Sequence, residues 1–218
     1  MSSGKLCGMD TALPAPSLTQ RSRRVQILDA ALSLFGEHGV SNVTTRQIAK
    51  AVGISQPSLY AHFATREAIC VAVCTRAFDT LYELLCAAVV PEDSPHERLI
   101  KMGRTYVHFG LNNEAAYRVA FMDEMGDKLP HDHPDGPTHD QAHDQIMSAG
   151  LRAFSLLKAQ FDSVYGADST ESLVRAQSSW ATLHGLVSLF IARIEFPWAD
   201  HEALIEFHLT QYCRAALI

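Results

Sequence analysis

One segment of twenty residues near the amino end constrains the fold more than any other part of the chain. It begins at Thr44 and reads TTRQIAKAVGISQPSLYAHF. Thr44 and the glutamine three residues later have the spacing of a capping box, which starts a helix, and Gly53 can adopt the left-handed conformation that ends one. Ser55 is a good cap for a second helix, and Pro57 is tolerated in its first turn. The segment therefore predicts a helix-turn-helix.

The second of these helices has an inward and an outward face. Leu59 and Phe63 are four residues apart, so both point towards the core. Glutamine can bind adenine through two hydrogen bonds, while serine, histidine and tyrosine can bind base edges or phosphates. The outward residues are Gln56, Ser58, Tyr60, Ala61 and His62. This pattern favours a helix that reads the DNA major groove, although a structural corner with incidental polar residues would have the same spacing.

The segment resembles the DNA-binding domain of the tetracycline-repressor (TetR) family of bacterial regulators. The resemblance runs from Arg21 to about Cys70, beginning with the helix RRVQILDAALSLFGEHGV and ending with TREAI. It implies that Arg46 and Gln56 contact bases and that Pro57 offers an apolar contact. It also implies phosphate contacts from Thr45, Ser58, Tyr60, His62 and Arg66. Ala61 departs from the family pattern, which has a large aromatic residue there, so an operator sequence cannot be carried over.

The charge is distributed as a DNA-binding amino end requires. The whole chain has a net charge of −6. Residues 1–66 contain seven Lys or Arg and three Asp or Glu, a net charge of +4, whereas the rest contains eleven and twenty-one, a net charge of −10. The amino end would be attracted to phosphates and the acidic body repelled. A basic arm in the minor groove is an alternative use of Arg21, Arg23 and Arg24.

Helical patterns continue to the end of the chain. Capping signals and apolar periodicity predict helices over residues 65–89, 94–111, 114–125, 138–165, 168–195 and 200–217. We find no alternating strand pattern, so we expect an all-α protein. Its expected parts are a flexible arm (1–19), a three-helix DNA-binding domain (20–66) and a larger helical ligand-binding and dimerisation domain (67–218).

Composition favours a cytoplasmic protein that has no membrane partner. No apolar run approaches the eighteen residues of a membrane span, and the first sixteen residues lack the apolar core of a signal peptide. The five cysteines include no CxxC pair, and an odd count suits a reducing compartment. Cys70 and Cys74 are four apart on a helix that would link the two domains. They could form a thiol switch or act as small buried apolar residues.

The last two predicted helices carry apolar stripes that could form a homodimer through a four-helix bundle. The stripe residues are Leu173, Ala176, Trp180, Leu183, Leu186, Val187, Phe190, Ile194, Leu204, Phe207, Leu209, Tyr212 and Ala216. Part of each stripe must also face the chain's own core. A dimer would place two reading helices about 34–36 Å apart, which selects a palindromic operator.

The segment WATLHG, from Trp180 to Gly185, resembles the tryptophan–histidine–glycine signature of one C-terminal domain type in the TetR family. The segment NEAAYR, which ends at Arg118, matches a second feature of that group. The physical alternative is that Trp180 and His184 pack on a buried helix face, with Gly185 allowing another helix to approach.

The resemblance further implies a small-molecule effector, of unidentified structure, that weakens operator binding without a required cofactor. Apolar and aromatic residues between 94 and 195 could enclose it or could be plain core. The candidate ligand-binding residues are Met102, Tyr106, Phe109, Tyr117, Phe121, Met122, Phe154, Leu157 and Trp180, with His108 or His184 as polar anchors.

A histidine- and aspartate-rich segment, KLPHDHPDGPTHDQAHDQ, could bind zinc or nickel or could be a polar loop. Its candidate ligands are His131, His133, His139 and His143. They raise the alternatives of a metal-sensing regulator and a metal-dependent hydrolase. The chain contains no HExxH, GxSxG, phosphate-binding glycine loop or dinucleotide fingerprint. We therefore expect a ligand-responsive transcriptional repressor and not an enzyme.

Overall fold

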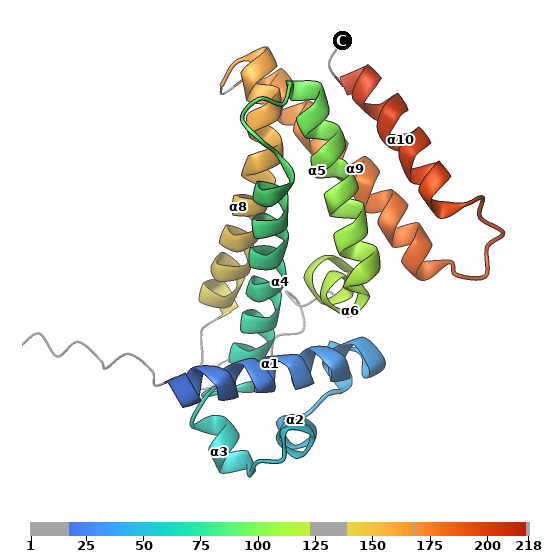
Figure 1. Cartoon of the computed structure of the whole chain (residues 1–218). Coiled ribbons are helices and arrows are strands. Elements are labelled where there is room, and N and C mark those ends of the chain that lie inside the picture. The colour runs from blue at the N-terminus through green and yellow to red at the C-terminus, as the bar shows by residue number, and fades with distance from the viewer. Residues whose placement is uncertain (1–17, 123–138, 168, 217–218) are drawn as a thin grey trace, which may run out of the picture.

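The computed structural model describes residues 18–122, 139–167 and 169–216, with the backbone alone for residues 18–21, 139 and 212–216 (Figure 1). Every regular element in these ranges is helical, which confirms the all-α expectation. The elements are α1 (Leu18–His38), the 3-10 turn η1 (Val40–Asn42), α2 (Thr45–Val52), α3 (Gln56–Tyr60), α4 (Arg66–Ala88), α5 (Pro95–Asn112), α6 (Glu114–Tyr117), the π-helical turn η2 (Arg118–Met122), α8 (His139–Tyr165), α9 (Thr170–Ala192) and α10 (His201–Ala216).

Short polar side chains start most of these helices where the sequence predicts. Thr44 begins α2 and Ser94 begins α5, each through a reciprocal capping box with the residue three positions later. Ser55 and Thr65 cap α3 and α4 by accepting a hydrogen bond from a backbone N–H of the first turn. Gly53 ends α2 at φ 71°, in the left-handed region that glycine adopts without strain.

The helices form a small amino-terminal group and a larger body that share α4 (Figure 1). Helix α1 lies across the lower end of α4, with α2 and α3 beneath it. One hydrophobic cluster joins α1, α2 and α3 to the first turns of α4, and a second joins the rest of α4 to α5, α6, α8, α9 and α10. Because α4 contributes to both clusters, it connects the two parts of the fold mechanically.

Three helices differ from their predicted bounds. Helix α1 begins at Leu18, three residues before the start at Arg21 that the resemblance implies. The helix predicted over 114–125 becomes the π-helical turn η2 after Tyr117, and its last three residues lie outside the described part of the chain. Helix α9 is capped by Ser169 and ends at Ala192, three residues before the predicted end. Arg193 leaves the helical conformation there, and its carbonyl accepts a hydrogen bond from the indole of Trp198.

The thiols of Cys70 and Cys74 are both buried in the cluster that contains α2 and α3. Burial raises the pKa of the Cys70 thiol to about 11, and the Cys74 thiol donates a hydrogen bond to the Val119 carbonyl. A buried thiol with a raised pKa is a poor nucleophile, so this geometry favours the apolar packing role over the redox switch.

None of the helices in the described ranges is both long enough and apolar enough to pass through a lipid bilayer.

Candidate DNA-binding face and ligand cavity

Helix α3 has only five residues, so its position depends on what it buries. Leu59 is completely buried and Phe63, just beyond the helix, is 3% exposed. Both pack in the same cluster as Ile48 of α2, which fixes the angle between the two helices. Because the inner side chains fix the position of α3, the side chains on its outer face have a fixed position on the protein surface.

A hydrogen-bonded group ties the outer side chains of α2 and α3 together. The Gln56 amide donates to the Thr45 hydroxyl at 3.0 Å, and the Tyr60 hydroxyl lies 3.2 Å from the same oxygen. Thr45 is itself only 8% exposed. In the free protein Thr45 thus orients Gln56 and Tyr60, whereas the resemblance implies that it contacts phosphate directly.

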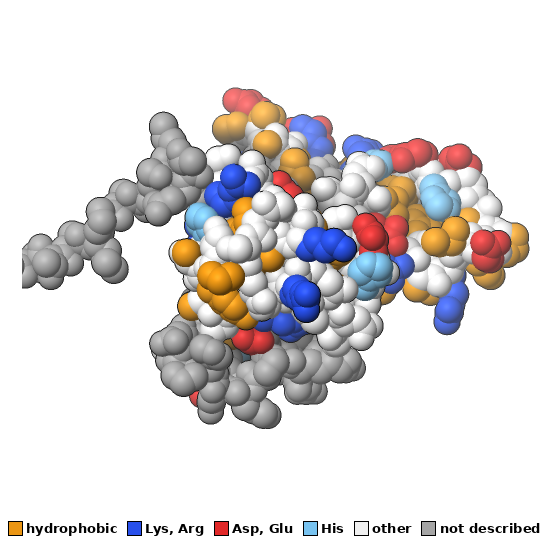
Figure 2. All heavy atoms as spheres, turned by 90° about the horizontal axis from the view of Figure 1, so that it is seen from below, with side chains coloured by type: hydrophobic (Ala, Val, Ile, Leu, Met, Phe, Trp, Pro, Cys, Tyr) orange, Lys and Arg blue, Asp and Glu red, His pale blue; other side chains and the backbone are white. Residues whose placement is uncertain are grey.

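The remaining surface of these two helices is basic or neutral. Arg46, Lys50 and Pro57 are exposed, and Ser58 and His62 are half-buried. Neither α2 nor α3 contains an acidic residue. Figure 2, which views this end of the molecule from below, shows basic side chains scattered over a face that is otherwise mostly uncharged. Such a surface attracts phosphates while leaving neutral donors and acceptors for base edges.

Two arginines near this face bind other groups of the same chain. The guanidinium of Arg66 donates to the carbonyls of Val43, at 2.7 Å, and Val40, so it braces the turn before α2. Arg24 lies 3.9 Å from the ring centroid of Phe63 and donates to the carbonyl of His62. Arg66 was expected to bind phosphate, and in the free protein its hydrogen bonds are directed to the backbone instead.

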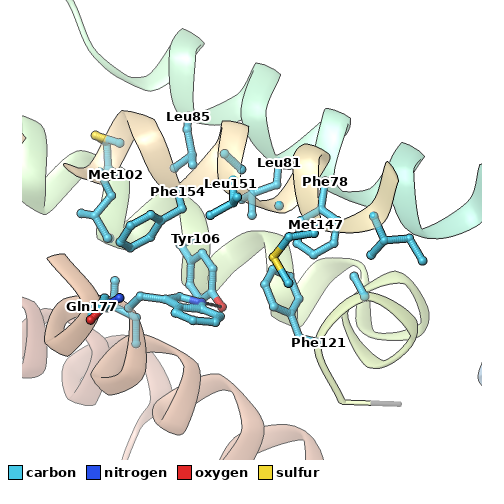
Figure 3. A pocket seen from close by; sticks show the side chains of 18 residues that line it. Phe78, Leu81, Leu85, Met102, Tyr106, Phe121, Met147, Leu151, Phe154 and Gln177 are labelled. Carbon is cyan, nitrogen blue, oxygen red and sulfur yellow. Dashed lines mark hydrogen bonds between the residues drawn. The ribbon is translucent and has the colours of Figure 1, made fainter. Parts of the chain in front are cut away.

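The body contains a cavity of about 360 Å³ between α4, α5, α8 and α9, and η2 contributes Ala120 and Phe121 to its lining. Figure 3 shows its labelled side chains converging from several helices on one space. The lining residues are Phe78, Leu81, Leu85, Met102, Gly103, Tyr106, Ala120, Phe121, Ile146, Met147, Gly150, Leu151, Ala153, Phe154, Leu157, Gln177, Trp180 and Leu183. A concave apolar space of this size is typical of a small-molecule site.

Six of the residues suggested by the sequence line this cavity: Met102, Tyr106, Phe121, Phe154, Leu157 and Trp180. Five do not line it: Phe109, Tyr117, Met122, His108 and His184. Sequence reasoning missed the wall that α4 provides, although Phe78, Leu81 and Leu85 recur at helical spacing and indicate a second apolar face. It also missed Met147 and Leu151 of α8 and Gln177 of α9.

Tyr117 and His184 form a hydrogen-bonded chain behind the cavity wall. The Trp180 indole donates to the Tyr106 hydroxyl at 3.2 Å, which lies 3.0 Å from the Tyr117 hydroxyl. The Tyr117 hydroxyl is 2.7 Å from Nδ1 of His184, whose Nε2 is 3.2 Å from the Ser188 hydroxyl. Burial raises the pKa of Tyr106 to about 12 and also raises that of Tyr117. Both phenols therefore stay protonated. The hydrogen bonds can then all run in one direction, from the Trp180 indole through the Tyr106 and Tyr117 hydroxyls to Nδ1 of His184.

The neutral form of His184 completes this chain and makes stability depend on pH. Burial lowers the pKa of His184 below its usual 6.5, so the unfolded chain binds a proton at a higher pH than the folded one. The free energy of unfolding should then fall as pH drops through 6.5 and level off below the folded pKa. We expect His184→Gln to reduce this loss in urea unfolding measured across that range. Parallel plots of unfolding free energy against pH for the two proteins would contradict the prediction. Burial also lowers the pKa of His208, but this residue is present in both proteins, so its effect cancels in the comparison.

Two family patterns match the chain. Residues 27–73 match bacterial regulatory proteins of the tetR family, and residues 99–212 match the tetracyclin repressor-like C-terminal domain. The second match alone spans more than half of the chain and includes the segment from Trp180 to Gly185. The chain belongs to the TetR family. This match is consistent with the C-terminal domain type that the tryptophan–histidine–glycine signature predicts, and the family is one of regulators and not of enzymes.

Curated relatives of this TetR-family chain are similar to it over part of its length. The class D tetracycline repressor of Escherichia coli is 28% identical over 138 residues, which cover 62% of the chain and 57% of that protein. The transcriptional repressor KstR2 of Rhodococcus jostii is 43% identical over 60 residues, covering 27% of the chain and 29% of that repressor. The chain thus matches little more than half the length of the tetracycline repressor.

Similarity in fold extends over almost the whole TetR-family chain. The structure of a bacterial regulatory protein of the tetR family from Rhodococcus RHA1 superimposes with a TM-score of 0.68 at 18% identity. The superposition covers 89% of this chain and 96% of that one. At this identity the likeness concerns the fold alone.

The apolar stripes of α9 and α10 divide between the core and the surface. Six residues are buried in the chain's own core: Ala176, Leu183, Leu186, Val187, Phe190 and Leu209. Four are exposed: Leu173, Trp180, Ile194 and Phe207. Leu204 is half-buried, and the side chains of Tyr212 and Ala216 lie outside the described residues. Gly185 also faces away from the chain, because a Cβ placed there would meet no atom within 4 Å.

Of the four candidate metal ligands, His131 and His133 lie outside the described residues, as does the side chain of His139. His143 is exposed on α8. Within the described part of the chain, no three His, Cys, Asp or Glu side chains are grouped closely enough to hold a metal ion.

Proposed function

We propose that this TetR-family chain is a ligand-responsive transcriptional repressor, which binds a palindromic DNA operator as a homodimer and is released by a small molecule. The observation that carries the proposal is the rigid α2–α3 pair, whose outer face bears Arg46, Gln56 and Tyr60 and no acidic side chain. The names of the curated relatives, both repressors, support it. A DNA operator as partner would place the protein in the cytoplasm.

On this proposal Arg46 and Gln56 read bases and Pro57 makes an apolar contact. Tyr60, Ser58 and His62 bind phosphate. The hydrogen bonds of Arg66 and Thr45 support two changes to the roles that the family resemblance implies. Arg66 would hold the turn before α2, and Thr45 would orient Gln56 and Tyr60. Gln56 would exchange its bond to Thr45 for an adenine edge when DNA is bound.

Arg46→Ala should weaken operator binding by about 1–3 kcal/mol and relax the preference at one base pair in each half-site. Lys50→Ala is a matched control, because Lys50 is also an exposed cation of α2. Its loss should weaken binding equally on all sequences and reduce the salt dependence by about one phosphate contact. Fluorescence anisotropy with the operator and with single-base variants measures both effects. Equal weakening by Arg46→Ala on every sequence would reassign Arg46 to phosphate.

The homodimer is proposed to use the outer face of α9 with the exposed residues of α10. Between Gln177 and Leu189 this face carries only small side chains at Ser178, Ala181 and Gly185. A partner helix could approach closely there and then meet the exposed Leu189. Ile194 and Phe207 would extend the apolar contact to the ends of the two helices.

Two contacts could carry the effect of a ligand from the cavity to the DNA-binding face. Helix α4 contributes Phe78 to the cavity wall and buries Ile69 among the residues that hold α2 and α3. Helix α6 packs on α1 so closely that a Cβ at Gly36 would lie 2.6 Å from the Cβ of Ala115. A ligand that displaces α4 or α6 would thus change the distance between the two reading helices and oppose DNA binding.

A further inference from the structure

Among the described residues, the wall of the body cavity has no charged side chain and few polar ones. None of its lining residues among the described parts of the chain is Asp, Glu, Lys, Arg or His. Five are aromatic: Phe78, Tyr106, Phe121, Phe154 and Trp180. Moving an ionised group into such surroundings without a partner costs several kcal/mol or more, so a charged ligand would have to neutralise or stay outside.

The few polar atoms of the wall are largely engaged with each other. The Trp180 indole N–H donates to the Tyr106 hydroxyl, which is also within 3.0 Å of the Tyr117 hydroxyl. Gln177 is the other polar side chain, and within the described residues its amide makes no hydrogen bond. Among the described residues, a ligand would therefore find one free polar side chain, at the α9 edge of the cavity.

The cations that are adjacent in sequence to lining residues are paired elsewhere. Lys101 and Arg104, next to Met102 and Gly103, pair with Asp93 and Glu206. Arg152 follows the lining residue Leu151, yet its guanidinium lies 4.7 Å from the ring centroid of Tyr82 and pairs with Asp79. It is thus held over α4 and not over the cavity.

Exposure marks where a ligand would enter. Leu81 of α4 and Met102 of α5 are buried, whereas Leu151 is 55% exposed and Met147, Gln177 and Trp180 are exposed as well. The rim therefore lies between α8 and α9, with Gln177 on it (Figure 3).

From these features we infer that the effector is an uncharged, mostly apolar small molecule, with at most one polar group, which faces Gln177. This inference rests on the proposed function, since it assigns the chemistry of the same cavity. It excludes free carboxylates, phosphate esters and ammonium compounds as the buried part of the effector.

Three probes of nearly equal shape test the charge: phenylbutanol, phenylbutyrate and phenylbutylammonium. Trp180 lies in the cavity wall and Trp198 is the other tryptophan, so the Trp198→Phe variant gives a fluorescence signal from the cavity alone. At neutral pH we expect the alcohol to bind at least about tenfold more tightly than either ion. Equal or tighter binding of an ion would overturn the inference, as would failure of all three to bind.

A positive charge placed on the rim should reduce the preference for the alcohol over phenylbutyrate. Leu151→Lys changes a residue that is more than half exposed, so the fold should tolerate it, and we expect it to raise the affinity for phenylbutyrate at least about tenfold. Val164→Lys is the matched control, because Val164 is an exposed residue of α8 that does not line the cavity. An equal gain with Val164→Lys would show that phenylbutyrate binds elsewhere.

Operator binding measured without any probe separates this inference from the function on which it rests. If the wild-type protein binds its operator specifically but prefers a charged probe, the effector chemistry is wrong and the regulator stands. If it binds every DNA sequence equally, the proposed function fails whichever probe fits the cavity.

Discussion

Replacing Gly185 by arginine should turn the protein into folded monomers. A Cβ at this position meets nothing within the chain, and arginine forms helices better than glycine, so the monomer should keep α9 intact. In the proposed dimer the side chain would enter a close helix contact, where overpacking costs about 1–3 kcal/mol, and symmetry would place two copies there. We expect the dimer dissociation constant to rise by roughly two orders of magnitude or more, measured by sedimentation velocity.

Two variants make this result specific. Gly185→Ala adds one methyl group and should weaken the dimer much less. Ala87→Arg adds the same charge at an exposed position of α4, away from α9 and α10, and should leave the dimer unchanged. A Gly185→Arg protein that remains dimeric would place the interface elsewhere. If it is monomeric, its affinity for a full palindrome should fall towards that for a half-site, because the two reading helices are no longer linked.

Leu59→Ala should cost about 2–5 kcal/mol of unfolding free energy and abolish specific DNA binding. Leu59 is completely buried and is the main anchor of a helix only five residues long. Such a short helix has little stability of its own, so its position must come from packing. Chemical denaturation measures the first effect and operator anisotropy the second.

Tyr60→Ala, at the next position, distinguishes the packing of α3 on the core from its contact with DNA. Tyr60 is 43% exposed, and its hydroxyl lies near that of Thr45 on the outer surface. We expect operator affinity to fall with an unfolding free energy within about 1 kcal/mol of the wild type. If Leu59→Ala retained full operator affinity, α3 would not be the reading helix.

The sequence predicts local features of this fold well because their causes are local. Thr44, Ser55 and Ser94 start helices by accepting a hydrogen bond from the backbone N–H three residues later, so their spacing alone identifies them. The same holds for the inward face of α3, where the four-residue interval between Leu59 and Phe63 is sufficient.

The cavity and its second layer could not be predicted in this way. Periodicity shows that a helix has an apolar face, but not which helix that face meets. Tyr117 was expected at the ligand, yet it lies one layer behind Tyr106, to which it is hydrogen-bonded. Phe78 lies on α4, a helix that both connects the two domains and forms a wall of the cavity with one of its faces, and the sequence shows only the first of these roles.

The contact of Gly36 with Ala115 limits the direction in which force can pass between the body and α1. The two helices are already too close to admit one more methyl group, and alanine and glycine offer no polar side chain to attract each other. Such a close contact transmits a push from α6 to α1 directly, because any nearer approach would overlap their atoms. We therefore expect an inducer to act by pressing α6 outward against α1, so that molecules which fill the cavity without expanding it would occupy the protein and leave the operator bound.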